Sequence, residues 1–467
     1  MTMSVTGTRS ELDQHREHNA DKAALDAVRA RLTEAGVEFL YYQTVTLTGR
    51  VIGKAVPVGH LARNAQSGVQ LHRTGLSDLQ TCQDGTLLGG GCAASEFTAV
   101  PELDTLAVLP WDTRVARFFC RLYEPDHAPD GVAGRPLPLD VRGNLARVHA
   151  AFTARTGLEL RSGCEPEMSW TGPGLEARNR PHTSPAYHID HLERNRPIYQ
   201  KVIGYAQAMG LDMIEGDYED PGQLELNWMF DHADRTADRL VVYRQICRQV
   251  ARELGVTASF MPKPANDRKG NGCHHNLSLW RGDRNVLVDP DVRELHLTDA
   301  GRHAVGGILR HAAAATAVMG PTVNSYKRYW HAGQFAPTHI DWGMDNKTCT
   351  VRLSANGRLE FKLPDSMVNP YLSHAVLLAA IEDGLTHDIE PGPPQRGSGY
   401  PATGPRPETL PSTLGEALDR FTADPVVTDA LGPETTELFT ALKRDEWARY
   451  CGTVTDWEHT MYADEGV

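Results

Sequence analysis

The chain has 467 residues, 40% hydrophobic and 23% charged, which is ordinary for a globular protein large enough for two domains. Its net charge of -13 argues against nucleic-acid binding, because a phosphate backbone requires a basic face. No signal-peptide core and no apolar run of ~18 residues is present, which argues against a membrane partner. The eight cysteines are scattered without a CxxC pair, so we expect reduced thiols and a cytoplasmic location.

The first quarter of the chain predicts a small strand-rich domain. Residues 1–24 are polar and are expected to form a disordered tail. Residues 25–36 have helical apolar spacing, and residues 37–58 alternate like two strands of a hairpin. Strand-like runs continue until the proline- and glycine-rich segment 127–140, which indicates a linker or an entry strap. We therefore expect a first domain over residues 25–126.

Residues 127–467 predict a larger domain in which helices alternate with short strands. A helix is expected over 144–157, followed by a strand over 158–170. Asn369 and Pro370 predict the start of another helix, because proline is tolerated in a first helical turn.

Three strand-like segments of this second domain carry glutamates among apolar residues. In CEPEMSW, a period of two places Glu165 and Glu167 on one face, and GQLELNW does the same for Glu225 and Asn227. RLEFKL adds Glu360. Clustered carboxylates suit hard cations such as Mg²⁺ or Mn²⁺. An antiparallel strand with one wet face shows the same alternation, so both interpretations stay open.

The segment GNGCHHNLSLW, residues 270–280, holds two adjacent histidines. If it is a strand, His274, Asn276 and Ser278 share one face and His275 points to the other. Adjacent side chains diverge, and no second Cys/His cluster follows at regular spacing, which disfavours zinc. A core strand with one satisfied histidine is the alternative.

Cations follow in NSYKRYW and in the run from residue 345 to 362. Alternation places Arg358, Glu360 and Lys362 on one face. This arrangement predicts a phosphate or carboxylate clamp next to a metal ligand, with a solvated charged strand as the alternative.

These segments resemble the glutamine synthetase family in their order. The resemblance runs from about residue 35 to the C-terminus and is carried by CEPEMSW, DYEDPGQLELNW, FMPKP, GNGCHHNLSL, NSYKR, DNKTCTVRL and RLEFKLPDSMVNPYL. It implies an α+β fold with a small N-terminal β-grasp domain and a large C-terminal catalytic domain. In that domain helices flank a curved antiparallel sheet. It also implies a homo-oligomer, with hexameric rings forming a dodecamer and active sites between subunits.

The resemblance implies ATP-dependent amide formation with two or three Mg²⁺ or Mn²⁺ ions. A glutamate-like carboxylate attacks the γ-phosphate of ATP, and an amine displaces phosphate from the acyl phosphate. Positioning and charge neutralisation carry such phosphoryl transfer. By motif, the implied metal ligands are Glu165, His274 and Glu360 for one ion and Glu167, Glu219 and Glu225 for another. Asp217 rivals Glu219, because the spacer before PGQ is short.

The remaining roles are also carried over by motif. The implied nucleotide contacts are Arg352, Arg358, Ser278 and Lys347; the implied substrate contacts are Arg328, Gly270, Asn276, Lys362, Thr74 and Asp78; the implied catalytic residues are Arg352, Lys347, Gln334 and Arg328.

Several of these positions depart from the family pattern. Gln334 stands where the family has a catalytic glutamate, and Thr74 stands where it has the aspartate that prepares ammonium. Asn276 replaces a histidine, and Lys347 and Lys362 replace arginines.

Ammonium must be bound as a cation and deprotonated, whereas a pre-formed weakly basic amine, a hydrazine or an arylamine needs less of this. We therefore hypothesise a γ-glutamyl ligase that uses an organic amine or hydrazine rather than ammonia. The alternatives are a ligase of another acid, an N-phosphorylating relative, and a non-catalytic regulatory homologue.

Overall fold

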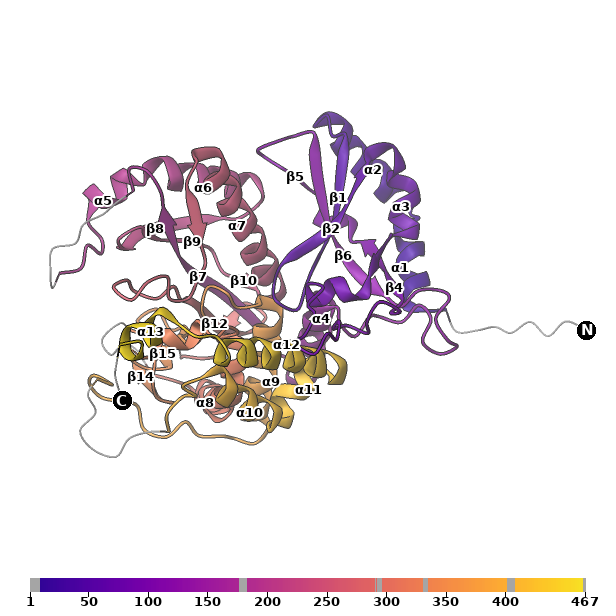
Figure 1. Ribbon diagram of the computed structural model, residues 1–467. Helices are drawn as coiled ribbons and strands as arrows, with labels where there is room; N and C mark the ends of the chain where they lie inside the picture. The colour runs from indigo at the N-terminus through magenta and orange to yellow at the C-terminus, as the bar shows by residue number, and fades with distance from the viewer. Residues whose placement is uncertain are drawn as a thin grey trace, which may run out of the picture.

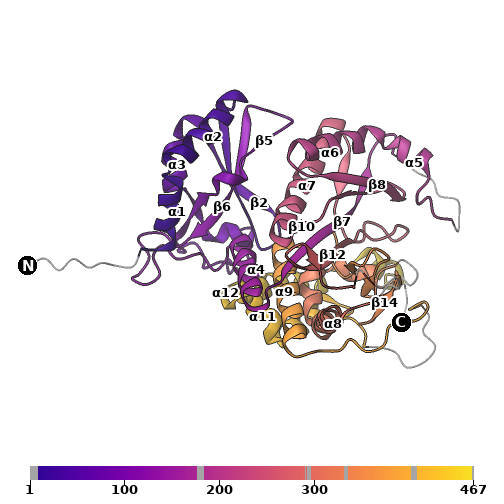
Figure 2. The ribbon, with the colours of Figure 1, turned by 180° about the vertical axis from the view of Figure 1, so that it is seen from behind.

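The computed structural model describes residues 9–464 except 176–182, 290, 292–295, 331–334 and 401–407. Two lobes are visible, each with its own sheet (Figures 1 and 2). Within the described residues all eight cysteines are free thiols. None of the described helices combines the length and the apolar character of a bilayer span.

The N-terminal lobe is a six-stranded sheet with three helices on its outer side (Figure 1). The sheet has the order β2-β1-β6-β4-β3, with β5 paired to β6, and only β1 and β6 run parallel. Its elements are α1 (Glu11–Asn19), α2 (Lys22–Glu34), β1 (Phe39–Val45), β2 (Val51–Pro57), α3 (Leu61–Ser67), β3 (Val69–His72), β4 (Glu96–Pro101), β5 (Ala107–Val108) and β6 (Val115–Tyr123). The predicted hairpin is confirmed as β1 and β2, which pair from Phe39 opposite Pro57 to Val45 opposite Val51.

The expectation of a disordered tail up to residue 24 is wrong for the described part of that segment. Ser10 caps α1 by accepting a hydrogen bond from the Asp13 backbone N–H, and α1 is followed directly by α2. Leu12 is fully buried, and Asn19 Nδ2 donates to the Pro101 carbonyl oxygen over 2.8 Å. The polar composition did not predict this helix, because only one apolar side chain and buried amide hydrogen bonds attach it to the lobe.

The second lobe is built on a ten-stranded sheet of order β14-β15-β16-β12-β7-β9-β8. Strands β10 and β11 add to β7, β13 adds to β12, and only β14 and β15 run parallel. The strands are β7 (Glu159–Thr171), β8 (Met213–Asp220), β9 (Gln223–Trp228), β10 (Asp231–His232), β11 (Thr257–Ser259), β12 (Cys273–Arg281), β13 (Arg284–Asn285), β14 (Trp342–Met344), β15 (Val351–Leu353) and β16 (Leu359–Phe361).

In Figure 1 the helices of residues 189–254 lie above β7 and β12 and most of the other helices of this lobe lie below them, so helices flank this sheet on more than one side. They are α4 (Val141–Thr156), α5 (Ile189–Arg194), α6 (Arg196–Ala208), α7 (Ala233–Leu254), α8 (Asp299–Met319), α9 (Pro370–Thr386), α10 (Leu414–Thr422), α11 (Pro425–Leu431), α12 (Pro433–Cys451) and α13 (Asp456–Tyr462), of which α5 and α6 lie beside β8. The start of α9 confirms the sequence prediction, with Asn369 as the cap and Pro370 in the first turn.

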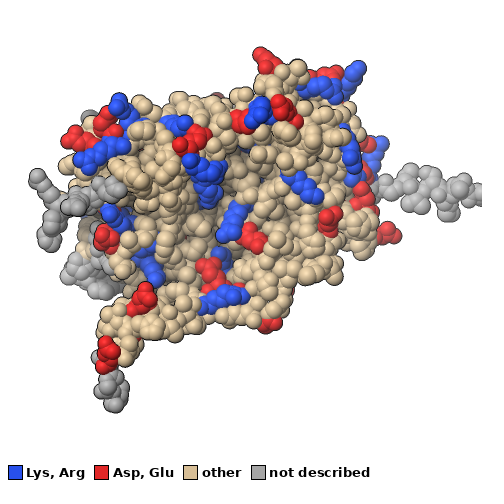
Figure 3. Space-filling view, turned by 45° about the horizontal axis from the view of Figure 1, so that its top comes forward, with Lys and Arg blue, Asp and Glu red and all other residues tan. Residues whose placement is uncertain are grey.

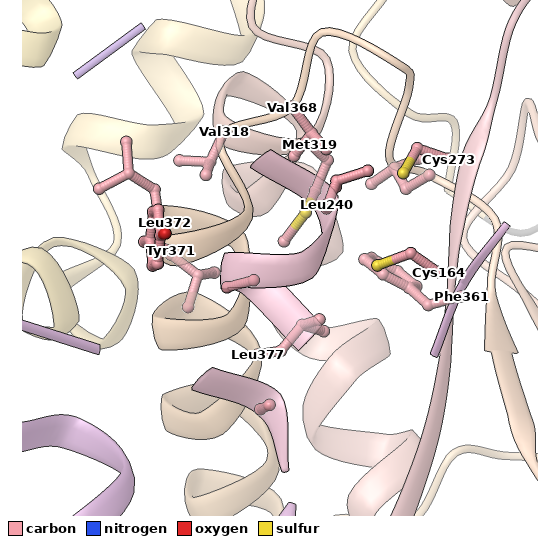
Figure 4. Packing of buried hydrophobic residues seen from close by; sticks show 14 of the residues in the cluster. Cys164, Leu240, Cys273, Val318, Met319, Phe361, Val368, Tyr371, Leu372 and Leu377 are labelled. Carbon is pink, nitrogen blue, oxygen red and sulfur yellow. The ribbon is translucent and has the colours of Figure 1, made fainter. Parts of the chain in front are cut away.

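The core lies between the sheet and the helices. Figure 4 shows Cys164, Cys273 and Phe361 of the sheet facing helix residues such as Leu240 and Met319. Each of these five side chains is at most 2% exposed. The outer surface in Figure 3 carries Lys and Arg next to Asp and Glu rather than a patch of one sign.

A buried ion-pair network joins α8 to its neighbours. His311 Nδ1 lies 2.6 Å from Asp424, and Nε2 lies 3.0 Å from Asp383. Burial alone would lower the pKa of His311, but the two carboxylates outweigh it and raise this pKa. The stabilisation is therefore present below pH ~6.5 and is lost as the pH rises through the folded-state pKa.

We expect His311→Gln to lower the free energy of unfolding by about 2 kcal/mol at pH 6 and by less at pH 9. Thermal unfolding midpoints at the two pH values measure this. His303→Gln on the same helix is the matched control, because Asp388 and Glu390 beside His303 are exposed. An equal loss at both pH values would contradict the assignment.

Candidate functional site

The charged face of the large sheet gathers three side chains from neighbouring strands. In register, His274 of β12 lies opposite Glu165 of β7, and Asn276 lies opposite Glu360 of β16. His274 Nδ1 is 3.5 Å from Glu165 Oε2 and 3.4 Å from Glu360 Oε1. Their ligand atoms all lie within 4.8 Å of one another, a spacing that one ion could span. The structure thus brings together the first set of predicted metal ligands.

Cations surround these carboxylates. Arg352 Nη1 donates to Glu360 over 2.6 Å, and Lys362 Nζ donates to Glu360 over 2.9 Å. Arg358 donates to Glu165 over 2.9 Å. Burial alone would raise the pKa of Glu360, but Lys362, His274 and Arg352 outweigh it and hold this pKa well below its ordinary value. The predicted shared face of residues 358, 360 and 362 is present and is largely buried rather than a solvated strand.

A second group of carboxylates lies beside the first. Glu225 of β9 is opposite both Glu167 of β7 and Asp217 of β8. Burial, with Glu219 and Glu167 nearby, raises the pKa of Asp217 to about 7. Burial and the neighbouring glutamates raise the pKa of Glu225 well above its ordinary value. Crowded, buried carboxylates of this kind need a cation, and all-oxygen donors suit Mg²⁺ or Mn²⁺.

Asp217 and Glu219 both reach this second group. Asp217 lies directly opposite Glu225, and its buried Oδ1 atom has no hydrogen-bond partner among the described residues. Glu219 follows in a strand irregularity between residues 218 and 220, and its Oε2 lies 3.9 Å from Lys269 Nζ. Asp217 and Glu219 therefore both remain candidates for a ligand of the second metal ion.

The two carboxylate groups line one cavity of about 540 Å³, called here the acidic cavity. Its other polar lining residues include Gln223, Lys269, Gly270, Arg328, Lys347, Arg352, Arg358 and Lys362. Gly270 is required by close approach, because a Cβ there would lie 2.6 Å from Arg328 Cγ. Arg328 is 4% exposed and donates to the Leu363 carbonyl oxygen over 3.3 Å.

A neighbouring cavity of about 450 Å³, called here the aromatic cavity, shares Glu165 and Arg358 with the acidic one. Phe230 and Trp280 lie in it with ring centroids 5.9 Å apart at 23°. Trp280 Nε1 donates to Ser278 Oγ over 2.8 Å. Flat apolar surfaces next to Arg358 offer a place for a planar base whose phosphates reach the acidic cavity.

Several predicted residues lie elsewhere. Asn276, predicted to contact substrate, lines the aromatic cavity with Ser278 and not the acidic one. Thr74 and Asp78 line neither cavity: Thr74 is buried with its hydroxyl 2.6 Å from His72, and Asp78 accepts from Thr48. Gln334 lies outside the described residues.

Among the lining residues that the sequence analysis did not single out are Tyr187, Gln223, Phe230, Lys269, Trp280 and Phe335. One had a signal. Trp280 continues the alternating face of His274, Asn276 and Ser278 by one more step. Tyr187 and Phe335 come from segments without a periodic pattern, so only the fold reveals them.

The second histidine of the pair belongs to the core. His275 Nε2 lies 2.8 Å from Ser373 Oγ and Nδ1 lies 3.7 Å from Cys164 Sγ. His374 stacks on it at 4.5 Å and also has a partner at each ring nitrogen, Ser162 Oγ and the Pro370 carbonyl oxygen. The cluster of Cys164 and these two imidazoles is therefore saturated by hydrogen bonds.

Comparison with known proteins agrees with this geometry. Residues 139–462 match the family described as glutamine synthetase, catalytic domain. A glutamine synthetase of Rhizobium meliloti (strain 1021) is 32% identical over 447 residues, 92% of this chain and 98% of that protein. The chain belongs to the glutamine synthetase family. It is accordingly an ATP-dependent C–N ligase of the glutamine synthetase type, in a family that uses divalent metals.

One further relative is named for an organic amine, and a solved structure matches nearly the same share of the chain. A glutamate–methylamine ligase of Methyloversatilis universalis (strain ATCC BAA-1314 / DSM 25237 / JCM 13912 / CCUG 52030 / FAM5) is 32% identical over 455 residues, 93% of this chain and 98% of that protein. The solved GmaS/ADP complex superimposes with a TM-score of 0.83 at 32% identity, covering 93% of this chain and 99% of that chain. The expected family and the α+β fold are confirmed.

Glu360→Gln should lower the Mn²⁺-dependent affinity for ADP about 100-fold. It removes a proposed ligand oxygen and leaves Lys362 and Arg352 facing a neutral amide. Calorimetric titration with and without Mn²⁺ measures the affinity.

Glu159→Gln is the matched control, because Glu159 begins β7, a strand of the same sheet, and lines neither cavity. Unchanged ADP affinity in Glu360→Gln would show that Glu360 holds no metal.

Proposed function

We propose that this enzyme is a γ-glutamyl ligase that joins glutamate to an organic amine rather than to ammonia. The observation that carries the proposal is the pair of aromatic side chains on the acidic cavity, Tyr187 and Phe335, next to carboxylates. The two rings are 61% and 49% exposed, so the cavity offers apolar surface as well as negative charge. An alkylammonium ion needs both.

The backbone at both rings supports a functional role. Tyr187 has φ of 63° and Phe335 has φ of 57°, in the left-handed region that bulky residues rarely occupy. Such strain costs roughly 1–3 kcal/mol and concentrates at ligand-binding sites.

The rings lie next to the charges that would hold an amine. The Tyr187 hydroxyl lies near the carboxylates of Glu219 and Asp217. Partial burial, together with these two charges, raises the pKa of Tyr187 to about 12. Lys347 is electrostatically coupled to Glu219 and also borders Phe335 in a shallow recess. A cationic amine in this corner meets carboxylates at its nitrogen and rings along its substituent.

The two cavities support the following reaction. The base of ATP lies against the aromatic surface of Phe230 and Trp280, and its phosphates extend past Arg358 towards Arg352. Arg328 holds the α-carboxylate of glutamate. A γ-carboxylate oxygen attacks the γ-phosphorus and ADP leaves; the amine nitrogen then attacks the acyl carbon, loses a proton, and phosphate leaves as the C–O bond breaks.

Divalent cations fit the carboxylate groups. One ion would be held by Glu165, His274 and Glu360, and another by Glu167 and Glu225 with Asp217 or Glu219. Such ions neutralise charge on the transferring phosphoryl group. The chain's own cations, Arg352 and Arg358, lie close enough to stabilise the same charge.

The departures at positions 74 and 334 agree with this assignment. Thr74 and Asp78 lie outside both cavities of their own chain, which is consistent with a ring in which they face the neighbouring subunit's site. The hexameric or dodecameric assembly and the cytoplasmic location remain part of the proposal. No observation favours the N-phosphorylating alternative, and the intact ligand set disfavours a non-catalytic role.

With glutamate and Mn²⁺-ATP, ADP release should be faster with methylamine or a larger primary amine than with ammonium. We expect kcat/KM to favour the organic amine at least 10-fold, because its substituent contacts both rings. Coupled ADP detection across an amine panel, with the product confirmed by mass spectrometry, measures this. A preference for ammonium would overturn the proposal.

Phe335→Ala should raise KM for the preferred organic amine about 10-fold while leaving kcat/KM with ammonium within about twofold. Phe335→Leu keeps most of the apolar contact and is the matched variant, expected to fall between. Equal losses for both amines would show that the ring only supports the fold.

A further inference from the structure

A polar cavity of about 500 Å³ lies where the two lobes meet and shares no lining residue with the acidic or aromatic cavity. It is called here the junction cavity. Arg117 and Phe119 of β6 form one wall, Arg142 of α4 another, and Arg235 and Asp238 of α7 a third.

Most of the arginines on this cavity are neutralised. Arg142 forms a two-pronged pair with Asp238, at 2.8 and 2.9 Å, and also bonds Glu102. Arg121 bonds Glu102 over 2.5 Å, and Arg239 pairs with Asp231 at 2.9 Å. Two carboxylates of the cavity wall, Glu102 and Asp238, are thus used by Arg121 and Arg142, while Asp104 and Asp234 line the cavity without pairing with these arginines.

Arg117 differs from them. Arg117 is only 6% exposed. Among the described residues, no carboxylate oxygen lies within 4.0 Å of its guanidinium. It donates one long bond, Nη1 to the Thr105 carbonyl oxygen at 3.4 Å, and its Nε has no partner. Its guanidinium lies 4.2 Å from the centroid of the Phe119 ring.

An arginine has five N–H donors, and burying its charge without a hydrogen-bonded counter-charge is costly. Burial lowers the pKa of Arg117 to about 10, although the charge of nearby Asp238 acts in the opposite direction. The face of Phe119 compensates only part of the charge. The free donors of a planar guanidinium match two oxygens of one anion.

We propose that the junction cavity binds a small oxyanion, a carboxylate or inorganic phosphate, with Arg117 as its main ligand. Arg235, whose side chain is 72% exposed in the first turn of α7, supplies a second cation at the same cavity. Because β6 belongs to one lobe and α7 to the other, the bound anion would link the two lobes and stabilise their contact.

The test uses the full-length protein and no activity measurement. At matched ionic strength, phosphate or succinate in place of chloride should raise the thermal unfolding midpoint by about 2–4 °C. A rise with phosphate only, or with succinate only, identifies the preferred class. No rise with either would overturn the proposal.

Phosphate also has a place among the catalytic arginines, so two variants separate the sites. Arg117→Met removes the charge and keeps the volume. This variant should fold in chloride, but phosphate or succinate should raise its thermal unfolding midpoint less than that of the parent protein. Arg358→Gln leaves the junction cavity unchanged, so the rise in unfolding midpoint that depends on Arg117 should persist in this variant. An Arg117→Met rise equal to that of the parent protein would overturn the proposal.

A second measurement does not depend on the variant folding. Crystals of the unmodified protein soaked in selenate should show anomalous density within hydrogen-bond distance of the Arg117 guanidinium. Density at the catalytic arginines but not at Arg117 would overturn the proposal.

Discussion

The pairing of Glu360 with Arg352 and Lys362 is the interaction on which the site depends. Arg352 and Glu360 are register partners on two three-residue strands, so backbone pairing itself brings the charges together. Glu360 is 2% exposed and would not stay ionised there without these cations. A shift of one residue in this register would turn every side chain of β16 to the wrong face.

The same sheet has two unlike faces, and each supports the other. On one face of β7 and β12 stand Glu165, Glu167 and His274; on the other stand Cys164 and His275, packed against the helices (Figure 4). The core face provides the apolar burial that holds the strands in register. The charged face can then hold crowded carboxylates, and burial together with their mutual repulsion raises the pKa of Asp217 and Glu225.

The balance of charges at the junction of the lobes differs from the balance on the charged face of the large sheet. There Arg142 and Asp238 satisfy each other, whereas Arg117 keeps unused donors. The catalytic face instead leaves carboxylates without enough cations. The two places therefore have opposite needs: a cation on the sheet, and an anion at the junction. The place proposed for an organic substituent is the part of the acidic cavity where aromatic rings accompany the charge, at Tyr187 and Phe335.

The sequence by itself determined the family and the face on which each strand residue lies, because alternation is a local property of an extended backbone. The resemblance to the glutamine synthetase family implied that Glu165, His274 and Glu360 share one metal ion, and in the structure their ligand atoms lie within 4.8 Å of one another. Only the tertiary structure decided which strands lie side by side, since the order β16-β12-β7-β9-β8 joins segments far apart in the chain. That order placed Asn276 in the aromatic cavity and put Glu167 opposite Glu225, and the contact between the lobes left Arg117 buried without a hydrogen-bonded carboxylate. Such pairings depend on packing between distant segments, which no local pattern encodes.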